Sequence, residues 1–133
     1  ERDLWEPYRK HVLKFYTPPK DGRVIKVAVD AANGMGGKLV PKVFSGLPGL
    51  EIIPINMEIT GSFAHDPNPL VPANMKPTQD AVLASKADMG ASFDGDADRC
   101  ILCDEGRSHR LRSPDRADGG SLHQGRERRD GGV

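Results

Sequence analysis

The sequence has 133 residues, of which 19 are Lys or Arg and 19 are Asp or Glu, so its formal net charge is zero. This length suits one domain of ordinary size and is too short for most complete multi-domain enzymes. Nucleic-acid and membrane-surface binding usually need a basic excess, and no apolar run approaches the ~18 residues of a membrane-spanning helix. We therefore expect neither a nucleic-acid nor a membrane partner.

The zero net charge is the sum of two unlike parts. Residues 1–107 carry 13 basic and 15 acidic residues, whereas residues 108–133 carry 6 and 4. Apolar residues number 45 in the first part and 4 in the second, so only the first part can bury a core. We expect residues 108–133 to be disordered. Their many Arg and Gly residues and lack of Lys suggest a frameshifted tail, and a genuine basic linker is the alternative.

Two features bear on the setting of the protein. Two Cys residues are too few for a disulfide framework, so a reducing, cytoplasmic location is expected. The chain opens with charged residues and shows no signal-peptide pattern. It also lacks an initiating Met, which suggests a fragment of a longer protein.

The first half of the chain predicts a helix followed by a strand-helix-strand unit. Apolar residues at helical spacing predict a helix over residues 4–16, with Asp3 as its cap and an aromatic stripe packed against a neighbour. A β-branched run predicts a strand over residues 24–29, covered on both faces. A glycine-rich turn, a helix to about Phe44 and a strand over residues 51–55 follow.

The second half predicts one more helix and two more strands. Residues 57–73 form a long irregular segment, and Asn74 is the expected cap of a helix that ends near residue 87. Strands are expected over residues 89–93 and 100–103. This alternation predicts a three-layer α/β/α domain with a mostly parallel sheet, whose functional loops follow the carboxyl ends of the strands.

An acidic loop follows the third predicted strand. Asp94, Asp96 and Asp98 alternate with small residues, and Arg99 comes next. Three carboxylates so close together repel one another unless a cation or solvent relieves them. Carboxylate oxygens are ligands that Mg²⁺ prefers, and an adjacent Arg can bind a phosphate. The loop is therefore a candidate Mg²⁺ site.

A calcium-binding EF-hand is the competing interpretation of this loop. With Asp94 as position 1, acidic residues fall at positions 1, 3, 5 and 12, the last being Glu105. Position 6 is Arg99, however, where an EF-hand needs Gly for a sharp turn. The residues before the loop also read as a strand. A non-catalytic cation-binding module of this kind is kept as the alternative, together with an inert truncated product.

Three segments in order resemble the α-D-phosphohexomutases, closest to the bacterial phosphomannomutase/phosphoglucomutase branch. They are the metal loop Asp94-Gly95-Asp96-Ala97-Asp98-Arg99, the glycine turn at residues 29–37 and the proline-rich stretch at residues 66–74, where Ala73 replaces the usual Glu. The resemblance covers roughly residues 4–107. It implies that residues 1–22 are a helix and linker from a missing first domain and that residues 23–107 are the second domain.

The family resemblance also implies a function. These four-domain enzymes interconvert hexose 1-phosphate and 6-phosphate through a phosphoserine that donates and recovers a phosphoryl group. The resemblance makes Asp94, Asp96 and Asp98 the ligands of Mg²⁺, the implied cofactor, and makes Arg99 the catalytic residue that orients the phosphoserine. The phosphoserine motif and the sugar-binding and phosphate-binding motifs of the later domains are absent from this sequence. The implied phosphosugar substrate therefore needs the missing domains, and the chain alone is expected to be inactive.

Three smaller features have structural interpretations. The glycine turn is read as a tight strand-to-helix turn in preference to a phosphate site. Cys100 and Cys103 should face opposite sides of a strand and serve as small apolar residues. His65 lies in the long segment, where a hydrogen-bonded structural role is favoured over contact with substrate.

Overall fold

The structure, a computed structural model, describes residues 2–104 and 108–110. Its core is a five-stranded sheet with the strand order β2-β1-β3-β4-β5. The strands are β1 (Ile25–Asp30), β2 (Leu50–Ile55), β3 (Met89–Phe93), β4 (Cys100–Cys103) and β5 (Ser108–Arg110). The helices are α1 (Trp5–Val12), α2 (Gly36–Phe44) and α3 (Lys76–Ser85), with short 3-10 turns at Leu13–Phe15 and Pro72–Met75. None of the helices in these residues is long and apolar enough to cross a membrane.

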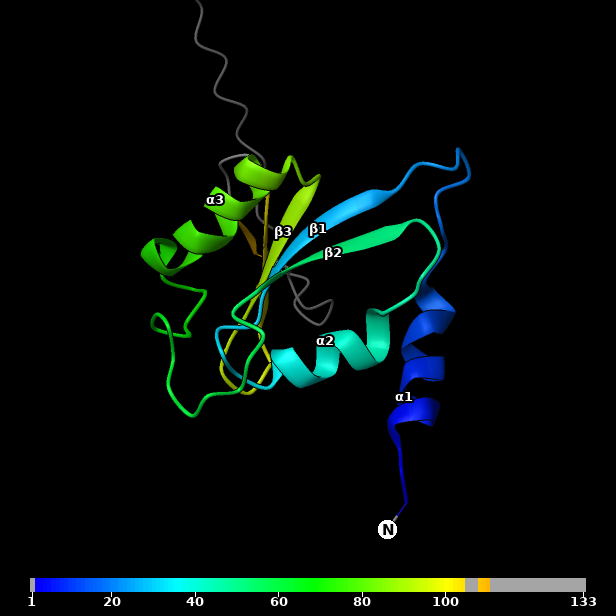
Figure 1. Cartoon of the computed structure of the whole chain (residues 1–133), viewed down its shortest axis with the longest axis horizontal. Coiled ribbons are helices and arrows are strands. Elements are labelled where there is room, and N and C mark those ends of the chain that lie inside the picture. The colour runs from blue at the N-terminus through cyan, green and yellow to red at the C-terminus, as the bar shows by residue number, and fades with distance from the viewer. Residues whose placement is uncertain (1, 105–107, 111–133) are drawn as a thin grey trace, which may run out of the picture.

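Helices cover both faces of the sheet, as the α/β/α prediction requires. Figure 1 shows α3 on one side of the sheet and α2, with α1 beside it, on the other. Successive strand residues point to opposite faces, and β1 accordingly buries Ala28 in the cluster that contains Val82 of α3 and Val29 in the cluster that contains Val40 of α2. The predicted three-layer α/β fold is confirmed.

The order of the strands brings the ends of β1 and β3 together. Strand β1 pairs in parallel with β2 on one side and with β3 on the other, so the chain reverses its direction of travel across the sheet at this point. Loops that follow the carboxyl ends of two such strands meet at one edge. The pairing of β4 with β3 is antiparallel, and so is that of β5 with β4. Strand β4 is thus the only one of the five that runs against the others.

Most predicted elements agree with the structure to within a residue or two, but the helix cap expected at Asn74 is not found. Asn74 was the expected cap, yet it lies inside the 3-10 turn Pro72–Met75, and α3 begins at Lys76. The Asn74 side chain donates instead to the carbonyl of Asn68, 2.9 Å away. An Asn side chain bonds readily to nearby backbone in turns as well as at helix starts. Here the Asn74 side chain bonds within the turn and does not cap the helix.

The C-terminal part of the chain differs from expectation over three residues. We expected disorder from residue 108 onward, whereas Ser108–Arg110 forms β5 on the edge of the sheet. Pairing with β4 uses backbone hydrogen bonds, which need no apolar side chain. The hydropathy pattern therefore does not predict this strand. Residues 111–133, and with them the frameshift hypothesis, lie outside the described residues.

Helix α1 lies at the surface of the domain. Asp3 accepts the backbone N–H of Trp5 at 2.9 Å, close to the predicted cap. None of the residues of α1 is buried, and Phe15 in the turn after it is 82% exposed. The aromatic stripe was expected to pack against a neighbour, and α1 does contact α2, with Lys42 over the ring of Trp5, but this contact buries none of the residues of α1. The helix is held mainly by Arg9, whose guanidinium donates to the carbonyls of Val43 and Ser45 at the end of α2.

Candidate metal centre

The acidic loop, residues 94–99, links β3 to β4 as a tight turn. The Asp94 backbone N–H donates to the carbonyl of Arg99, and the Ala97 N–H donates to the carbonyl of Asp94, both at 3.2 Å. Ala97 adopts a positive φ of 63°, which turns the backbone back on itself. The small residues Gly95 and Ala97 between the aspartates allow the backbone to turn in this way. Strands flank the loop on both sides, so the helix-loop-helix frame of an EF-hand is absent from residues 89–103.

The three aspartates converge. One carboxylate oxygen from each of Asp94, Asp96 and Asp98 can be chosen so that all three lie within 4.8 Å of one another. Oxygens on opposite sides of an Mg²⁺ ion are separated by about 4.2 Å, because each Mg²⁺–oxygen bond is about 2.1 Å long. The three oxygens are therefore close enough to one another that they could hold one small divalent cation. Asp94 is buried, whereas Asp96 and Asp98 are exposed and open the site to solvent.

Arg99 organises the buried member of the cluster. Its backbone N–H donates to one oxygen of Asp94 at 3.1 Å, and its Nε donates to the other. Burial works against the charged form of Asp94, but these bonds to Arg99 outweigh it and lower the pKa of the carboxyl. Asp94 is therefore a fixed carboxylate. The Arg99 side chain is about half exposed, so its remaining N–H groups can reach an incoming anion.

Asp98 has the opposite electrostatics. A hydrogen bond with the Asp94 carboxyl and the nearby charges of Asp96 and Asp94 raise the pKa of Asp98, and Arg99, whose Nε lies 3.6 Å from Asp98 Oδ1, offsets only part of this rise. Carboxylates held together in this way can be relieved by a bound cation. The metal site stays a prediction.

The glycine turn after β1 packs directly on the acidic loop. The Met35 backbone N–H donates to the carbonyl of Gly95 at 2.9 Å. A Cβ atom on Gly34 would lie 2.4 Å from that same oxygen, and one on Gly37 would lie 1.9 Å from the carbonyl oxygen of Met57. Close packing of backbones accounts for these two glycines. The structure thereby supports the tight-turn interpretation of this motif.

A third loop completes the edge. The long loop, residues 56–75, is tied to β1 by His65, whose Nε2 lies 2.9 Å from Asp30 Oδ2. It is tied to the glycine turn by Asn33, which accepts from the Ala64 N–H and donates to the Glu58 carbonyl. It reaches the acidic loop through Asn68, whose Oδ1 lies 3.5 Å from Arg99 Nη1.

Sequence reasoning missed two of the residues that join these loops. Asn33 and Asn68 bond across 25 to 31 positions of the chain, and a spacing of that length leaves no periodic signal. The Asp-Pro and Asn-Pro pairs at residues 66–69 mark turns, but they do not indicate which loop the turns contact. The hydrogen-bonded role preferred for His65 agrees with its pairing to Asp30.

The two cysteines lie on opposite faces of β4. Cys103 belongs to the cluster under α3, and Cys100 packs on the cluster under α2. Both thiols are free, and burial raises their pKa values, to about 11 for Cys100. They are therefore apolar packing residues, as predicted, and no part of the metal centre.

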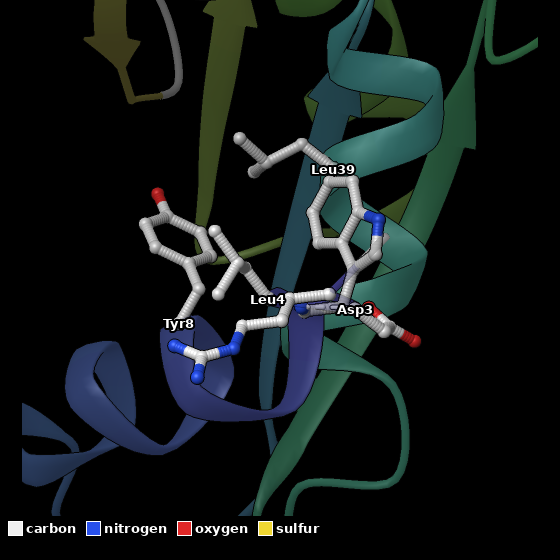
Figure 2. A pocket seen from close by; sticks show the side chains of 6 residues that line it. Asp3, Leu4, Tyr8 and Leu39 are labelled. Atoms are coloured by element: carbon white, nitrogen blue, oxygen red, sulfur yellow. Dashed lines mark hydrogen bonds between the residues drawn. The ribbon is translucent and has the colours of Figure 1, made fainter.

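A separate open groove lies beside α1. It is lined by Arg2, Asp3, Leu4, Trp5, Tyr8 and Leu39. In Figure 2 the side chains of Leu4 and Tyr8 lie on the same side of the groove as Leu39 of α2, with Asp3 beside Leu4. The groove is not lined by Asp94, Asp96 or Asp98, so the acidic loop and the groove are separate features.

Comparison with known proteins places the fold in a defined group. Residues 6–107 match the family described as phosphoglucomutase/phosphomannomutase, alpha/beta/alpha domain II. A phosphomannomutase of Vibrio cholerae is 38% identical over 108 residues, which cover 77% of this chain and 23% of that protein. A phosphomannomutase/phosphoglucomutase of Pseudomonas aeruginosa is 42% identical over 76 residues, 56% of this chain and 16% of that one.

A solved structure agrees with these sequence matches. The crystal structure of a phosphoglucomutase/phosphomannomutase family protein from Burkholderia thailandensis superposes with a TM-score of 0.70 and 30% sequence identity. The match covers 80% of this chain and 23% of the other. The chain thus spans less than a quarter of the length of each of these relatives.

Proposed function

The chain belongs to the phosphoglucomutase/phosphomannomutase family, in which it corresponds to the α/β/α domain II, and from this premise we propose that it supplies the Mg²⁺ site of a cytoplasmic phosphohexomutase. The observation that carries the proposal is the convergence of Asp94, Asp96 and Asp98 at the edge where the loops after β1 and β3 meet. The family supplies the reaction class, an isomerase that moves a phosphoryl group within a sugar.

Each residue of the loop has a chemical task in this proposal. Asp94, Asp96 and Asp98 would hold Mg²⁺ through carboxylate oxygens, with the remaining positions left for water and a phosphate oxygen. The bound ion supplies charge neutralisation for the phosphoryl group in transfer. Arg99 already fixes Asp94 through its Nε, and its exposed N–H groups would bind and orient the phosphoserine.

The division of labour follows from what the domain contains. Phosphoryl transfer needs positioning and electrostatic stabilisation more than covalent help from the protein, and the acidic loop offers both to an incoming phosphoserine. The phosphoserine and the contacts that select a hexose 1-phosphate or 6-phosphate would come from other domains of the enzyme. The isolated chain is therefore expected to bind a divalent cation weakly and to catalyse no turnover.

Metal binding by the chain itself is the first test. Titration with Mn²⁺, a paramagnetic substitute for Mg²⁺, should broaden the amide resonances of residues 94–99 selectively. Asp96→Asn removes an exposed ligand and should weaken binding at least about tenfold, since neutral amide oxygens are poorer ligands than carboxylates for hard cations. Asp80→Asn is the matched control, because Asp80 is an exposed acid paired with Lys76 on α3.

Two results would contradict the metal assignment. One is Mn²⁺ binding that Asp80→Asn and Asp96→Asn weaken equally, which would mean diffuse attraction to an acidic surface. The other is tight binding that strongly prefers Ca²⁺ to Mg²⁺, which would favour the non-catalytic calcium-binding alternative.

Activity needs a complete enzyme. Residues 6–107 can replace the matching segment of the Vibrio cholerae phosphomannomutase, and the chimera can be assayed for conversion of mannose 1-phosphate to mannose 6-phosphate. Activity that disappears with Asp96→Asn and survives Asp80→Asn is the expected result. A folded chimera that keeps its activity after all three aspartates become Asn would overturn the proposed role of the loop.

A further inference from the structure

His65 is held between two acceptors at the edge of the sheet. Its Nε2 lies 2.9 Å from Oδ2 of Asp30, and its Nδ1 lies 2.9 Å from the backbone carbonyl oxygen of Asp66. The side chain of Asp30 is fully buried and that of His65 is 17% exposed. Neither ring nitrogen is therefore left to bulk water.

Asp30 accepts hydrogen bonds at both of its side-chain oxygens. Its Oδ1 accepts the backbone N–H of Ala32 at 2.8 Å and the side-chain amide of Asn56 at 3.0 Å. Its Oδ2 is also within 3.4 Å of the hydroxyl of Thr78 from α3. With donors already bonded to both oxygens, the Asp30 side chain acts as an acceptor toward His65 as well.

The ring must carry two protons to satisfy both contacts. A neutral imidazole has one N–H and one lone pair, so one of its nitrogens would face an oxygen lone pair. Burial lowers the pKa of His65, but the hydrogen bonds to the Asp66 carbonyl and to Asp30, with the charges of Asp30 and Asp66, raise it above 6.5 overall. Asp30 from β1 and Asp66 from the long loop are the charged groups that act on the ring.

The residues on either side of His65 touch the acidic loop. A Cβ atom built on Gly95 would lie 3.4 Å from Cζ of Phe63 and 3.8 Å from Cγ of Pro67. Asn68 lies 3.5 Å from Arg99 through Oδ1 and Nη1. The segment from residue 63 to residue 68 therefore lies over the acidic loop, and His65 anchors its middle to β1.

We propose that His65 is a positioning residue for the acidic loop, which as an imidazolium ties the long loop to Asp30 and thereby holds Phe63 and Asn68 against Gly95 and Arg99. Loss of the proton removes one of the two hydrogen bonds of His65, and the segment 63–68 is then held less firmly over the acidic loop. The proposal rests on the proposed function only where it extends to cation affinity. The link between His65 and the acidic loop stands without any cation.

The coupling can be measured directly on the full chain by NMR. In the wild-type protein the His65 ring should titrate with a pKa above 6.5, and the amide resonances of Gly95 and Ala97 should shift over the same pH range. His65→Gln keeps a single N–H donor toward Asp30 and has no proton to lose, so that component of the titration should disappear. His11→Gln, in α1, should leave it unchanged.

Several outcomes would overturn the proposal. One is a His65 ring that is neutral at pH 6 in the folded wild-type protein, a measurement that needs no variant. Another is a titration of the Gly95 and Ala97 amides that persists in folded His65→Gln. The proposal also fails if those two amides are insensitive to pH between 6 and 9 in the wild type.

Cation affinity separates this proposal from the proposed function. Carboxylate ligands alone make Mn²⁺ bind more tightly as the pH rises, because protons compete for the same oxygens. If His65 holds the long loop in place as proposed, the Mn²⁺ affinity of the wild type should fall about threefold between pH 6.5 and 8.5, because a charge-assisted hydrogen bond is lost. The Mn²⁺ affinity of His65→Gln should show no such fall. A chain that binds no Mn²⁺ at any pH would remove the metal site and leave the NMR coupling intact.

Discussion

The edge of the sheet and helix α1 use charged side chains in opposite ways. At the edge, Asp30 and Asp94 are buried. Asp30 accepts hydrogen bonds from the glycine turn and the long loop, and Asp94 accepts two from Arg99 of its own loop. In α1 no residue is buried, and the helix depends on two hydrogen bonds from Arg9 and on Lys42 lying 5.1 Å from the ring of Trp5. Buried carboxylates thus organise the irregular loops at the edge, whereas the regular helix α1 has no buried residue.

The largest expected effect is at the contact between the glycine turn and the acidic loop. Gly34→Ala would place a methyl group 2.4 Å from the carbonyl oxygen of Gly95, and since both sides are backbone neither can move cheaply. We expect a loss of about 3 kcal/mol in the free energy of unfolding, measured by urea denaturation. Gly95→Ala is the control across the same contact, because its nearest neighbour would be the Phe63 ring at 3.4 Å. If Gly34→Ala and Gly95→Ala lowered the free energy of unfolding equally, close backbone packing at Gly34 would not be the reason for the loss.

Asp94 should show the next largest effect. Asp94→Asn places an amide where both carboxylate oxygens accept from Arg99, and we expect a loss of about 2 kcal/mol. The lowered pKa of Asp94 means that its contribution is present above about pH 4, its ordinary pKa, and is lost as the pH falls through the folded-state value. The pH dependence of wild-type unfolding below pH 4 should therefore weaken in Asp94→Asn.

His65 should make a smaller contribution to the free energy of unfolding than Asp94, and this contribution should be lost as the pH rises. Its raised pKa means that the stabilisation is complete below about pH 6.5 and is lost as the pH rises through the folded-state value. We expect the wild type to lose about 1 kcal/mol on this rise, because one of two hydrogen bonds breaks. Urea unfolding curves of the wild type and His65→Gln should converge at high pH. A gap that widens instead would contradict the assignment of the charge.

The smallest effects are expected in α1. Arg9→Ala removes both hydrogen bonds to the end of α2, and since Arg9 is only partly buried we expect a loss of about 0.5–1 kcal/mol. Hydrogen exchange should show faster opening confined to α1. Phe15→Ala, at a side chain that is 82% exposed, should change stability by less than about 0.5 kcal/mol. If Arg9→Ala lowered the free energy of unfolding as much as Gly34→Ala, the proposed difference between the sheet edge and α1 would be wrong.

Local patterns predicted the framework well. The β-branched run before Asp30 gave the buried central strand, and the alternation of helices and strands gave the layers. The acidic loop was also evident, because three aspartates separated by small residues form a signal within six positions. Contacts of this range are encoded by neighbours in the chain, so they can be read without the fold.

Other features depended on distant residues. Asn74 lies in a 3-10 turn and bonds to Asn68 where a helix cap was expected. Strand β5 was not expected, because an edge strand is formed by backbone pairing with β4. The aromatic stripe of α1 was expected to be covered, but helical spacing says which side chains share a face and not what meets that face.

Local sequence patterns were sufficient to predict the α/β class, the order of the strands and helices along the chain, and the three candidate metal ligands. They did not reveal that β1 and β3 lie side by side, which brings the glycine turn, the long loop and the acidic loop together. The reason is physical: helix and strand periodicity arises between near neighbours, whereas the bonds of Asp30 to His65 and of Asn68 to Arg99 join residues more than thirty positions apart. Those bonds exist only once the sheet has brought their strands and loops together.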